Sequence, residues 1–332
     1  MRQRGEATAG AERRAAEPYV DPELAAALAA RGGVPEPLTP ERLAGWQRRD
    51  AAARPRPTVG QLADGGRFEV AEYDTGRVRL VCARPTGADG LLPVLYYLHG
   101  GGMVSGNAWS VLPRLLREWA QPLRLAVVSA EYRLAPAARH LEPVQDCRDG
   151  MHWVVENAGR LGLDAGRTVL GGKSAGGGLA AGLALLLRDT GGPAPIGQLL
   201  LSPMLDDRGT SRSARQAAGH DTWDRTSNAT AWQALLGERY GTAEVSPYAA
   251  PARAGDRDEL GALPPAYLEV GSAETFRDEV TAYADGLWRC GGSAELHVWP
   301  GAFHGFDTLA PEAAVSRQAR AARTAWLRRA LG

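Results

Sequence analysis

The feature that constrains the chain most is a glycine-flanked serine, Ser174, between an apolar segment and a helical segment. Residues Thr168–Gly171 are β-branched and apolar, which predicts a buried strand, whereas Gly178–Arg188 are rich in alanine and leucine and predict a buried helix. Gly172 and Gly176 stand two residues before and after the serine, where a side chain would collide with the neighbouring strand or helix. The pattern therefore predicts a sharp corner that exposes the serine hydroxyl at a helix N-terminus, where backbone N–H groups favour a developing negative charge.

This motif alone leaves other interpretations open. It is also typical of a glycine-rich turn without any chemistry, or of a turn that binds phosphate. Lys173 precedes the serine, but the upstream glycine spacing of a P-loop is missing. The dinucleotide spacing G-x-G-x-x-G has no match in a credible first strand–turn–helix unit either. Motifs elsewhere in the chain are needed to distinguish these interpretations.

Composition narrows the class of protein. Acidic and basic residues balance at 38 each, so no excess of charge indicates a nucleic-acid or anionic-membrane partner. No run of about 18 apolar residues predicts a membrane span, and no apolar segment follows the N-terminal arginines as a secretory signal requires. Three dispersed cysteines without a CxxC pair are typical of a reducing compartment. We therefore expect a cytoplasmic protein, and we assign no metal site.

Apolar strands alternate with helices through most of the chain. This alternation predicts a mostly parallel sheet that is covered by helices on both faces. The first two strands form a hairpin through Asp74–Gly76. The predicted strands are 67–73, 78–84, 91–98, 125–130, 168–172, 196–202, 264–270 and 294–299.

Two segments interrupt this rhythm. An N-terminal segment, 1–60, carries two short helical patterns, and a polar insertion, 206–261, separates the core residues 61–205 from the core residues 262–332. An insertion between sheet strands lies above their C-terminal ends, where α/β sheets bind ligands. Its aromatic residues form either a small core or the wall of a ligand site. They are Trp223, Trp232 and Tyr240.

A serine nucleophile needs hydrogen-bond donors for the oxyanion, and a second glycine-rich loop supplies them. This loop, His99–Gly102, directly follows a predicted strand. Its three glycines let backbone N–H groups approach a substrate carbonyl closely. We assign the oxyanion donors to the backbone N–H groups of Gly101, Gly102 and Ala175.

The base that takes the serine proton is predicted to be His304. It follows the last strand in a loop that can fold over the edge of the sheet, whereas the other histidines lie in helix, strand or insertion contexts or in the glycine-rich loop. For the carboxylate that orients His304 we choose Glu274, in the loop after the strand 264–270. Asp278 is the alternative, but it falls within the next helix and is less able to turn towards the histidine.

With these residues in order, the chain resembles the hormone-sensitive-lipase-like esterases of the α/β-hydrolase fold. The resemblance runs from about residue 65 to the C-terminus. It implies an eight-stranded, mostly parallel sheet, a helical cap built from the N-terminal helices and the 206–261 insertion, no cofactor, and a preference for short acyl esters. The motifs that carry it are His99–Gly102, Glu131–Pro136, the Ser174 corner, the loop of Glu274, and Phe303–Phe306.

Three positions depart from the family pattern. Glu274 stands where the family usually has an aspartate, although the longer carboxylate can still orient a histidine. Lys173 precedes the serine where an acidic or small polar residue is more frequent; it is either a solvated or ion-paired lysine or a residue that alters the electrostatics of the corner. Ala137 replaces a glutamate, so the role of that glutamate is not carried over.

The function predicted from the sequence is that of a serine carboxylesterase, which hydrolyses small-molecule esters with short-to-medium acyl chains through an acyl-enzyme. An acyltransferase with the same acyl-enzyme, or a non-catalytic ligand-binding protein on the same scaffold, is the alternative. Met103 and Val104 beside the glycine-rich loop, and Leu205 after the sixth strand, are expected to form walls of the pocket. Dimers are common in the family, which makes a homodimer an expectation.

Overall fold

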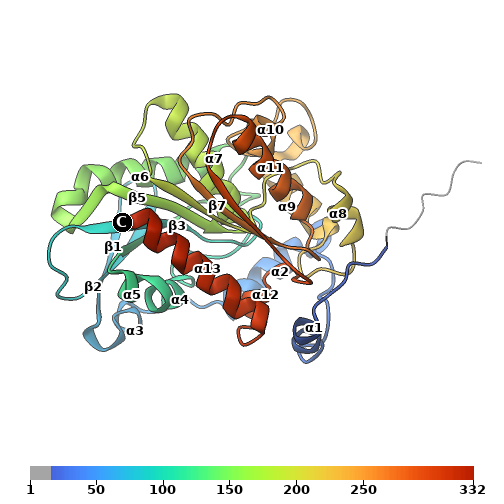
Figure 1. The fold of residues 1–332 in the computed structure, drawn as a ribbon, viewed down its shortest axis with the longest axis horizontal. Coiled ribbons are helices and arrows are strands. Elements are labelled where there is room, and N and C mark those ends of the chain that lie inside the picture. The colour runs from blue at the N-terminus through green and yellow to red at the C-terminus, as the bar shows by residue number, and fades with distance from the viewer. Residues whose placement is uncertain (1–15) are drawn as a thin grey trace, which may run out of the picture.

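The computed structural model of the protein describes residues 16–332, and its centre is a twisted sheet of eight strands (Figure 1). The strand order is β1-β2-β4-β3-β5-β6-β7-β8. β2 pairs antiparallel with β1 and β4, whereas all other neighbouring strands are parallel. The predicted fold class is confirmed. The strands are β1 (Phe68–Asp74), β2 (Arg79–Pro85), β3 (Leu92–Leu98), β4 (Ala126–Glu131), β5 (Leu163–Lys173), β6 (Gly197–Leu201), β7 (Ala266–Gly271) and β8 (Ala294–Trp299).

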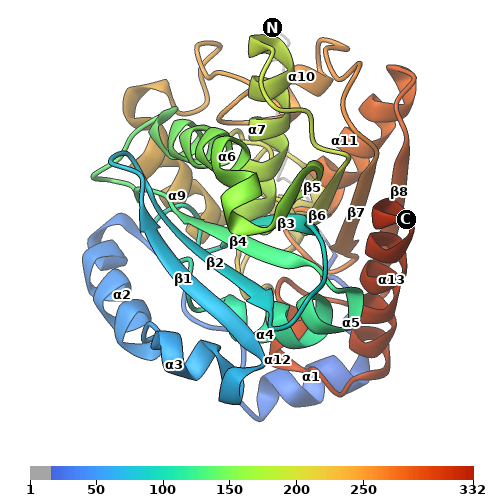
Figure 2. The same cartoon turned by 90° about the vertical axis from the view of Figure 1, so that its left-hand side faces the viewer.

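Helices cover both faces of this sheet (Figure 2). Because side chains alternate along a strand, β3 contributes to both layers. Val94, Tyr96 and Leu98 pack into the core under one set of helices, and Leu95 and Tyr97 pack into the core under the other set. The first set is α6 (Glu142–Leu161), α7 (Ala175–Thr190) and α11 (Arg277–Arg289), and the second includes α4 (Leu112–Leu115) and α13 (Ala314–Leu331).

The helical segment between β3 and β4 is interrupted. It begins as α4, continues as a π-helical turn, η2 (Leu116–Ala120), and ends as α5 (Gln121–Leu123). Within residues 16–332, no helix combines the length and the apolar character that crossing a membrane requires. The remaining helices are α1 (Pro22–Ala29), α2 (Pro40–Ala53), α3 (Val59–Leu62), η1 (Asp64–Gly66), α8 (Arg212–Gln216), α9 (Arg225–Leu236), η3 (Gly237–Arg239), α10 (Ala252–Gly255) and α12 (Phe306–Leu309).

The two helices of the N-terminal segment lie in different places (Figure 1). α2 lies next to the insertion, because Leu38, just before α2, is hydrogen-bonded to α9. The Leu38 N–H donates to Ser227 Oγ at 2.9 Å, and Thr230 Oγ1 donates to the Leu38 carbonyl at 2.9 Å. α1 packs elsewhere, with Leu24 in a separate apolar cluster that includes Phe306 of α12. The domain boundaries at residues 60, 205 and 261 stay a prediction.

Candidate active site

Ser174 occupies the corner between β5 and α7, where its backbone has a positive φ of 58°. A Cβ added to Gly172 would lie 2.2 Å from backbone atoms of Gly176, and one added to Gly176 would lie 2.0 Å from the Leu98 carbonyl oxygen. These close approaches are the physical reason for the two glycines. A positive φ costs free energy in a residue other than glycine, and such strain is typical of functional sites.

The structure brings Ser174, His304 and Glu274 into one hydrogen-bonded row. His304 Nε2 lies 3.0 Å from Ser174 Oγ, and His304 Nδ1 lies 2.9 Å from Glu274 Oε1. The three side chains come from the β5–α7 corner, the loop after β8 and the loop after β7, respectively. Ser174 is 7% exposed and Glu274 is 1% exposed, so water weakens these interactions little.

Two further groups hold the carboxylate of Glu274. Ser202 Oγ donates to Glu274 Oε2 at 2.9 Å, and the backbone N–H of Gly271 donates to the same oxygen at 2.8 Å. The alternative acid, Asp278, lies in the first turn of α11 and accepts the backbone N–H of Ser213 at 2.7 Å. Sequence analysis missed Ser202, because no motif marks a serine at the end of a strand.

Asp221, in the loop before α9, is a second residue that sequence analysis missed. Its Oδ1 accepts the backbone N–H of His304 at 2.8 Å, and its Oδ2 accepts that of Thr275 at 2.8 Å. Burial raises the pKa of Asp221 to about 6, although the nearby His304 opposes the shift. Only the position of this aspartate within the polar insertion could have pointed to it.

The glycine-rich loop after β3 lines the same cavity as Ser174. Gly101 and Gly102 have φ values of 120° and 64°, and within residues 16–332 their backbone N–H groups donate no hydrogen bond. A Cβ on Gly102 would lie 2.6 Å from the Trp223 side chain. Ala175 is the first residue of α7, so its N–H has no partner within the helix. All three predicted donors are thus next to the serine or in its cavity.

His99 is the first residue of this loop, but it does not line the cavity; its ring supports the loop from the core. Its ring stacks on Tyr132 with 4.2 Å between centroids, and the Tyr132 hydroxyl donates to the His99 carbonyl at 2.6 Å. Burial lowers the pKa of His99 to about 4, although the Gly100 carbonyl, 2.9 Å from Nδ1, opposes the shift. His99 is therefore neutral near pH 7, with an Nδ1–H that donates to the Gly100 carbonyl.

Ser174 and His304 open onto a cavity of about 720 Å³. Trp223 from the insertion lines this cavity, whereas Trp232 is fully buried and Tyr240 packs against the core, so the insertion supplies both a wall and a small core. The other aromatic and aliphatic lining residues are Trp46, Ala53, Pro55, Pro57, Tyr97, Val111, Pro113, Leu115, Trp119, Leu201 and Leu309.

The three residues expected as pocket walls do not line this cavity. Met103 and Leu205 are buried in the main core, and Val104 lines a different cavity. Met103 has a positive φ of 59° and is 1% exposed. The sequence marks the loop but does not determine these side-chain directions.

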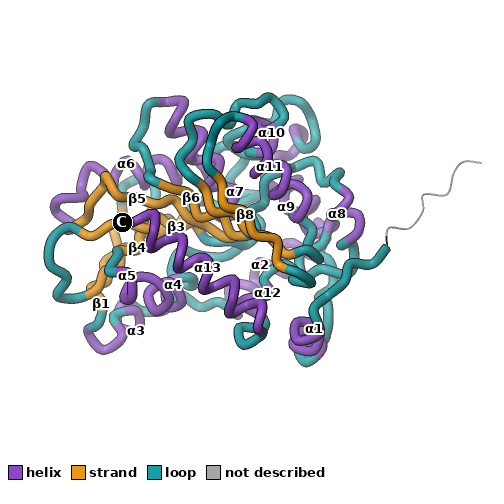
Figure 3. The backbone as a smooth tube through the Cα atoms, in the orientation of Figure 1, coloured by secondary structure: helices purple, strands orange, loops and turns teal. Residues whose placement is uncertain are grey.

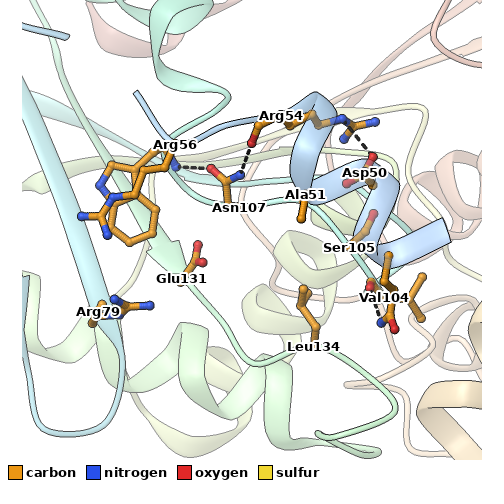
Figure 4. A pocket seen from close by; sticks show the side chains of 13 residues that line it. Asp50, Ala51, Arg54, Arg56, Arg79, Val104, Ser105, Asn107, Glu131 and Leu134 are labelled. Atoms are coloured by element: carbon orange, nitrogen blue, oxygen red, sulfur yellow. Dashed lines mark hydrogen bonds and ion pairs between the residues drawn. The ribbon is translucent and has the colours of Figure 1, made fainter. Parts of the chain in front are cut away.

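The cavity that Val104 lines has a volume of about 360 Å³, and residues 104–107 form part of its wall (Figure 4). Charged and aromatic side chains surround it. The guanidinium of Arg56 stacks on Trp109 at 3.6 Å, and Glu131 Oε2 accepts the backbone N–H of Ala108 at 2.7 Å. Burial raises the pKa of Glu131. Glu131 therefore supports the chain that continues from the glycine-rich loop.

Several known proteins with a similar sequence or fold are named as esterases or other hydrolases. A family model described as the alpha/beta hydrolase fold matches residues 95–308. The carboxylesterase NlhH of Mycobacterium tuberculosis is 33% identical over 246 residues, which cover 72% of this chain and 74% of that protein. An acetyl-hydrolase of Streptomyces hygroscopicus is 30% identical over 298 residues, which cover 86% of this chain and 93% of that protein. The structure of a bacterial heroin esterase superposes with a TM-score of 0.84 at 36% sequence identity. The superposition covers 95% of this chain and 98% of that chain.

The chain therefore belongs to the α/β-hydrolase fold family. Within that family it is a carboxylic-ester hydrolase, and the predicted resemblance to hormone-sensitive-lipase-like esterases is confirmed. Within residues 16–332, no cluster of three or more histidine, cysteine, aspartate or glutamate side chains is arranged to hold a metal ion.

Proposed function

We propose that the protein hydrolyses small carboxylic esters through an acyl-enzyme on Ser174, with His304 as the base and Glu274 as the residue that orients it. The observation that carries this proposal is the row of hydrogen bonds, 3.0 Å from Ser174 Oγ to His304 Nε2 and 2.9 Å from His304 Nδ1 to Glu274 Oε1. A hydroxyl is a weak nucleophile until a base within hydrogen-bond reach accepts its proton. This row supplies both the base and its orienting partner.

The reaction has two halves. Ser174 Oγ attacks the ester carbonyl while His304 Nε2 accepts the hydroxyl proton; His304 then gives that proton to the leaving alcohol. In the second half, His304 takes a proton from water as its oxygen attacks the acyl carbon. His304 then returns that proton to Ser174 Oγ as the bond between Oγ and the acyl carbon breaks, which releases the acid and the free serine. The carboxylate of Glu274 keeps the proton of the neutral imidazole on Nδ1 and stabilises the imidazolium that forms in each half.

The oxyanion of each tetrahedral intermediate is held by the backbone N–H groups of Gly101, Gly102 and Ala175. Their N–H groups have no competing partner in the loop or in the first turn of the helix. A donor of this kind contributes about 3 kcal/mol of transition-state stabilisation. The positive end of α7 adds to the same electrostatic effect.

The substrate class is an ester with a short-to-medium acyl chain. A cavity of about 720 Å³ is of the size that binds small molecules. Its lining of tryptophan, leucine and proline side chains favours apolar parts of a substrate. The relatives named above as an acetyl-hydrolase and a heroin esterase act on small acyl groups or small esters by their names, which supports this choice.

The test is hydrolysis of p-nitrophenyl esters from acetate to palmitate by the wild type and by Ser174→Ala. We expect turnover to be greatest for short-to-medium chains and to be abolished by the substitution. A fluorophosphonate probe should label the wild type and not Ser174→Ala. Ser110→Ala, which removes the other serine hydroxyl that lines the cavity, should still be labelled. Turnover that survives Ser174→Ala would overturn the mechanism.

A further inference from the structure

The cavity that contains Ser174 has one charged patch in an otherwise aromatic and aliphatic lining. Among the described residues that line it, the side chains of Arg54, Arg114 and Lys173 are basic, and none is acidic. Lys173 is the only lysine of the chain and directly precedes the serine. The charged side chains at the cavity wall are therefore all basic, although acidic and basic residues balance over the whole chain.

The carboxylate that neutralises part of this charge lies beneath the surface. Asp307 accepts from Lys173 Nζ at 2.6 Å and from an Arg114 guanidinium nitrogen at 2.6 Å. The side chain of Asp307 is 1% exposed, whereas those of Lys173 and Arg114 are 20% and 27% exposed. Burial alone would raise the pKa of Asp307, but Arg323, Lys173 and Arg114 outweigh it and hold that pKa well below its usual range. The ionised carboxylate of Asp307 therefore holds the Lys173 and Arg114 side chains in place from the buried side of the cavity wall.

Thr308 forms hydrogen bonds with both Lys173 and Arg114, so the two cations lie close together on the cavity wall. Its hydroxyl oxygen accepts from Lys173 Nζ at 3.0 Å and from Arg114 Nη1 at 3.1 Å. With both lone pairs engaged, the exposed hydroxyl has its own proton left to donate.

The cations also keep spare donors. An ammonium has three N–H groups and a guanidinium has five. In the described chain, Lys173 uses two of its three, on Asp307 and Thr308, and Arg114 uses three, on those two residues and on Glu118, which does not line this cavity. The cluster therefore offers several free donors and no free acceptor to a ligand.

We propose that this donor cluster, Lys173, Arg114 and Thr308, binds a carboxylate carried by the substrate, so that the enzyme prefers esters with an anionic group to matched neutral esters. The inference rests on the proposed ester hydrolysis at Ser174. A carboxylate presents acceptors only, and the planar fork of a guanidinium matches its two oxygens. A cluster that only braced the serine corner against α12 would have no effect on substrate choice.

Two pairs of substrates test the proposal. On the acyl side, p-nitrophenyl hydrogen adipate is compared with the primary amide of the same shape; on the alcohol side, p-acetoxybenzoate is compared with p-acetoxybenzamide. For each ester kcat/KM is corrected for spontaneous hydrolysis. In at least one pair we expect the carboxylate ester to be preferred by about tenfold, because a hydrogen bond to a charged group is stronger than one to a neutral group. The preference should fall as salt is added.

Variants connect the preference to the cluster. Arg114→Met should bring the ratio of the two kcat/KM values close to one, and Thr308→Val should lower it by less. Because the ratio is formed within one protein, a general loss of stability or activity cancels. Arg117→Met removes an exposed arginine from the adjoining turn, outside the cavity, and should retain both the activity and the ratio.

Ratios near one in both wild-type pairs, with the amide esters still hydrolysed, would overturn the anionic preference and leave the proposed function intact. A preference that both Arg114→Met and Thr308→Val retain would also overturn it. Failure to hydrolyse any of the four esters, with no labelling of Ser174 by a fluorophosphonate, would instead overturn the proposed function.

Discussion

The carboxylate of Asp221 accepts the backbone N–H of His304 at 2.8 Å. Its second oxygen accepts the N–H of Thr275, the residue after Glu274, at 2.8 Å. One buried side chain from the insertion therefore joins the two loops that carry the proposed base and its orienting carboxylate. The insertion therefore lines the cavity through Thr222 and Trp223 and also holds these two loops together through Asp221.

Asp221→Ala should lower kcat by about 10²-fold, because small displacements of reacting groups have effects of that size. Asp224→Ala is the matched control. Asp224 is also buried, but it caps α9 by accepting the N–H of Ser227 at 2.9 Å, so its loss should cost about 1 kcal/mol of stability and leave kcat nearly unchanged. Ester hydrolysis and thermal unfolding of both variants measure this difference. Equal losses of kcat would contradict the positioning role.

The acid assignment has a direct test in a pair of amide variants. Glu274→Gln should lower kcat by about 10⁴-fold, as removal of the corresponding charge does in serine proteases, because a neutral amide neither fixes the imidazole tautomer nor stabilises its cation. Asp278→Asn should lower kcat little, because that carboxylate bonds to the N–H of Ser213. Steady-state kinetics on one p-nitrophenyl ester compares them. The opposite order of losses would exchange the two assignments.

Local motifs allowed the serine corner, the glycine-rich loop and the histidine loop to be predicted. Each depends on neighbours within a few residues, such as the glycines that the Ser174 corner requires. Asp221 escaped prediction because it acts on His304, 83 residues away, through backbone atoms that have no sequence signature. The prediction of the pocket walls was wrong for a related reason: Met103 follows the glycine-rich loop directly, but its side chain is buried in the main core, and core packing depends on residues far away in the sequence.

The sheet shows the same limit. β5 was predicted from 168 onwards, where the residues are apolar, but it begins at Leu163, which pairs with Leu92. The segment Asp164–Arg167 contains two charged residues, an alanine and a glycine, so it breaks the apolar pattern, and the register of pairing with β3 shifts there. The beginning of this strand is determined by its pairing with β3 and not by its own residue types. Hydrophobic periodicity therefore does not reveal where the strand begins.

The oxyanion loop should not tolerate a side chain at Gly101. This residue has a φ of 120°, and an added Cβ would lie 2.3 Å from the Ser105 carbonyl oxygen, so the loop has to move. Gly101→Ala should therefore lower kcat by about 10²-fold or more, the effect of losing one oxyanion donor. Gly209→Ala is the control, because Gly209 also has a positive φ, of 58°, but its Cβ would meet nothing within 4 Å. The control should lose some stability without that loss of kcat; a similar kcat for both variants would count against the oxyanion assignment.

His99 should make the protein less stable in mild acid. Burial lowers the pKa of His99 to about 4, whereas a histidine in the unfolded chain has a pKa of about 6.5. Between these values the unfolded state binds more protons than the folded state, so the free energy of unfolding falls as the pH falls and is fully recovered above about pH 7. From pH 7.5 to 5.0 the contribution of His99 is a loss of about 2 kcal/mol.

Other groups also titrate in this range, and the burial of Asp221, whose pKa is raised to about 6, acts in the opposite direction. A matched variant separates the effect of His99. In His99→Asn the side-chain amide can still donate to the Gly100 carbonyl, as Nδ1 does in the wild type, but it does not titrate. Urea unfolding at pH 7.5 and 5.0 should therefore show a smaller loss of stability on acidification in His99→Asn than in the wild type. An equal loss in both proteins would mean that His99 does not remain neutral in the folded state.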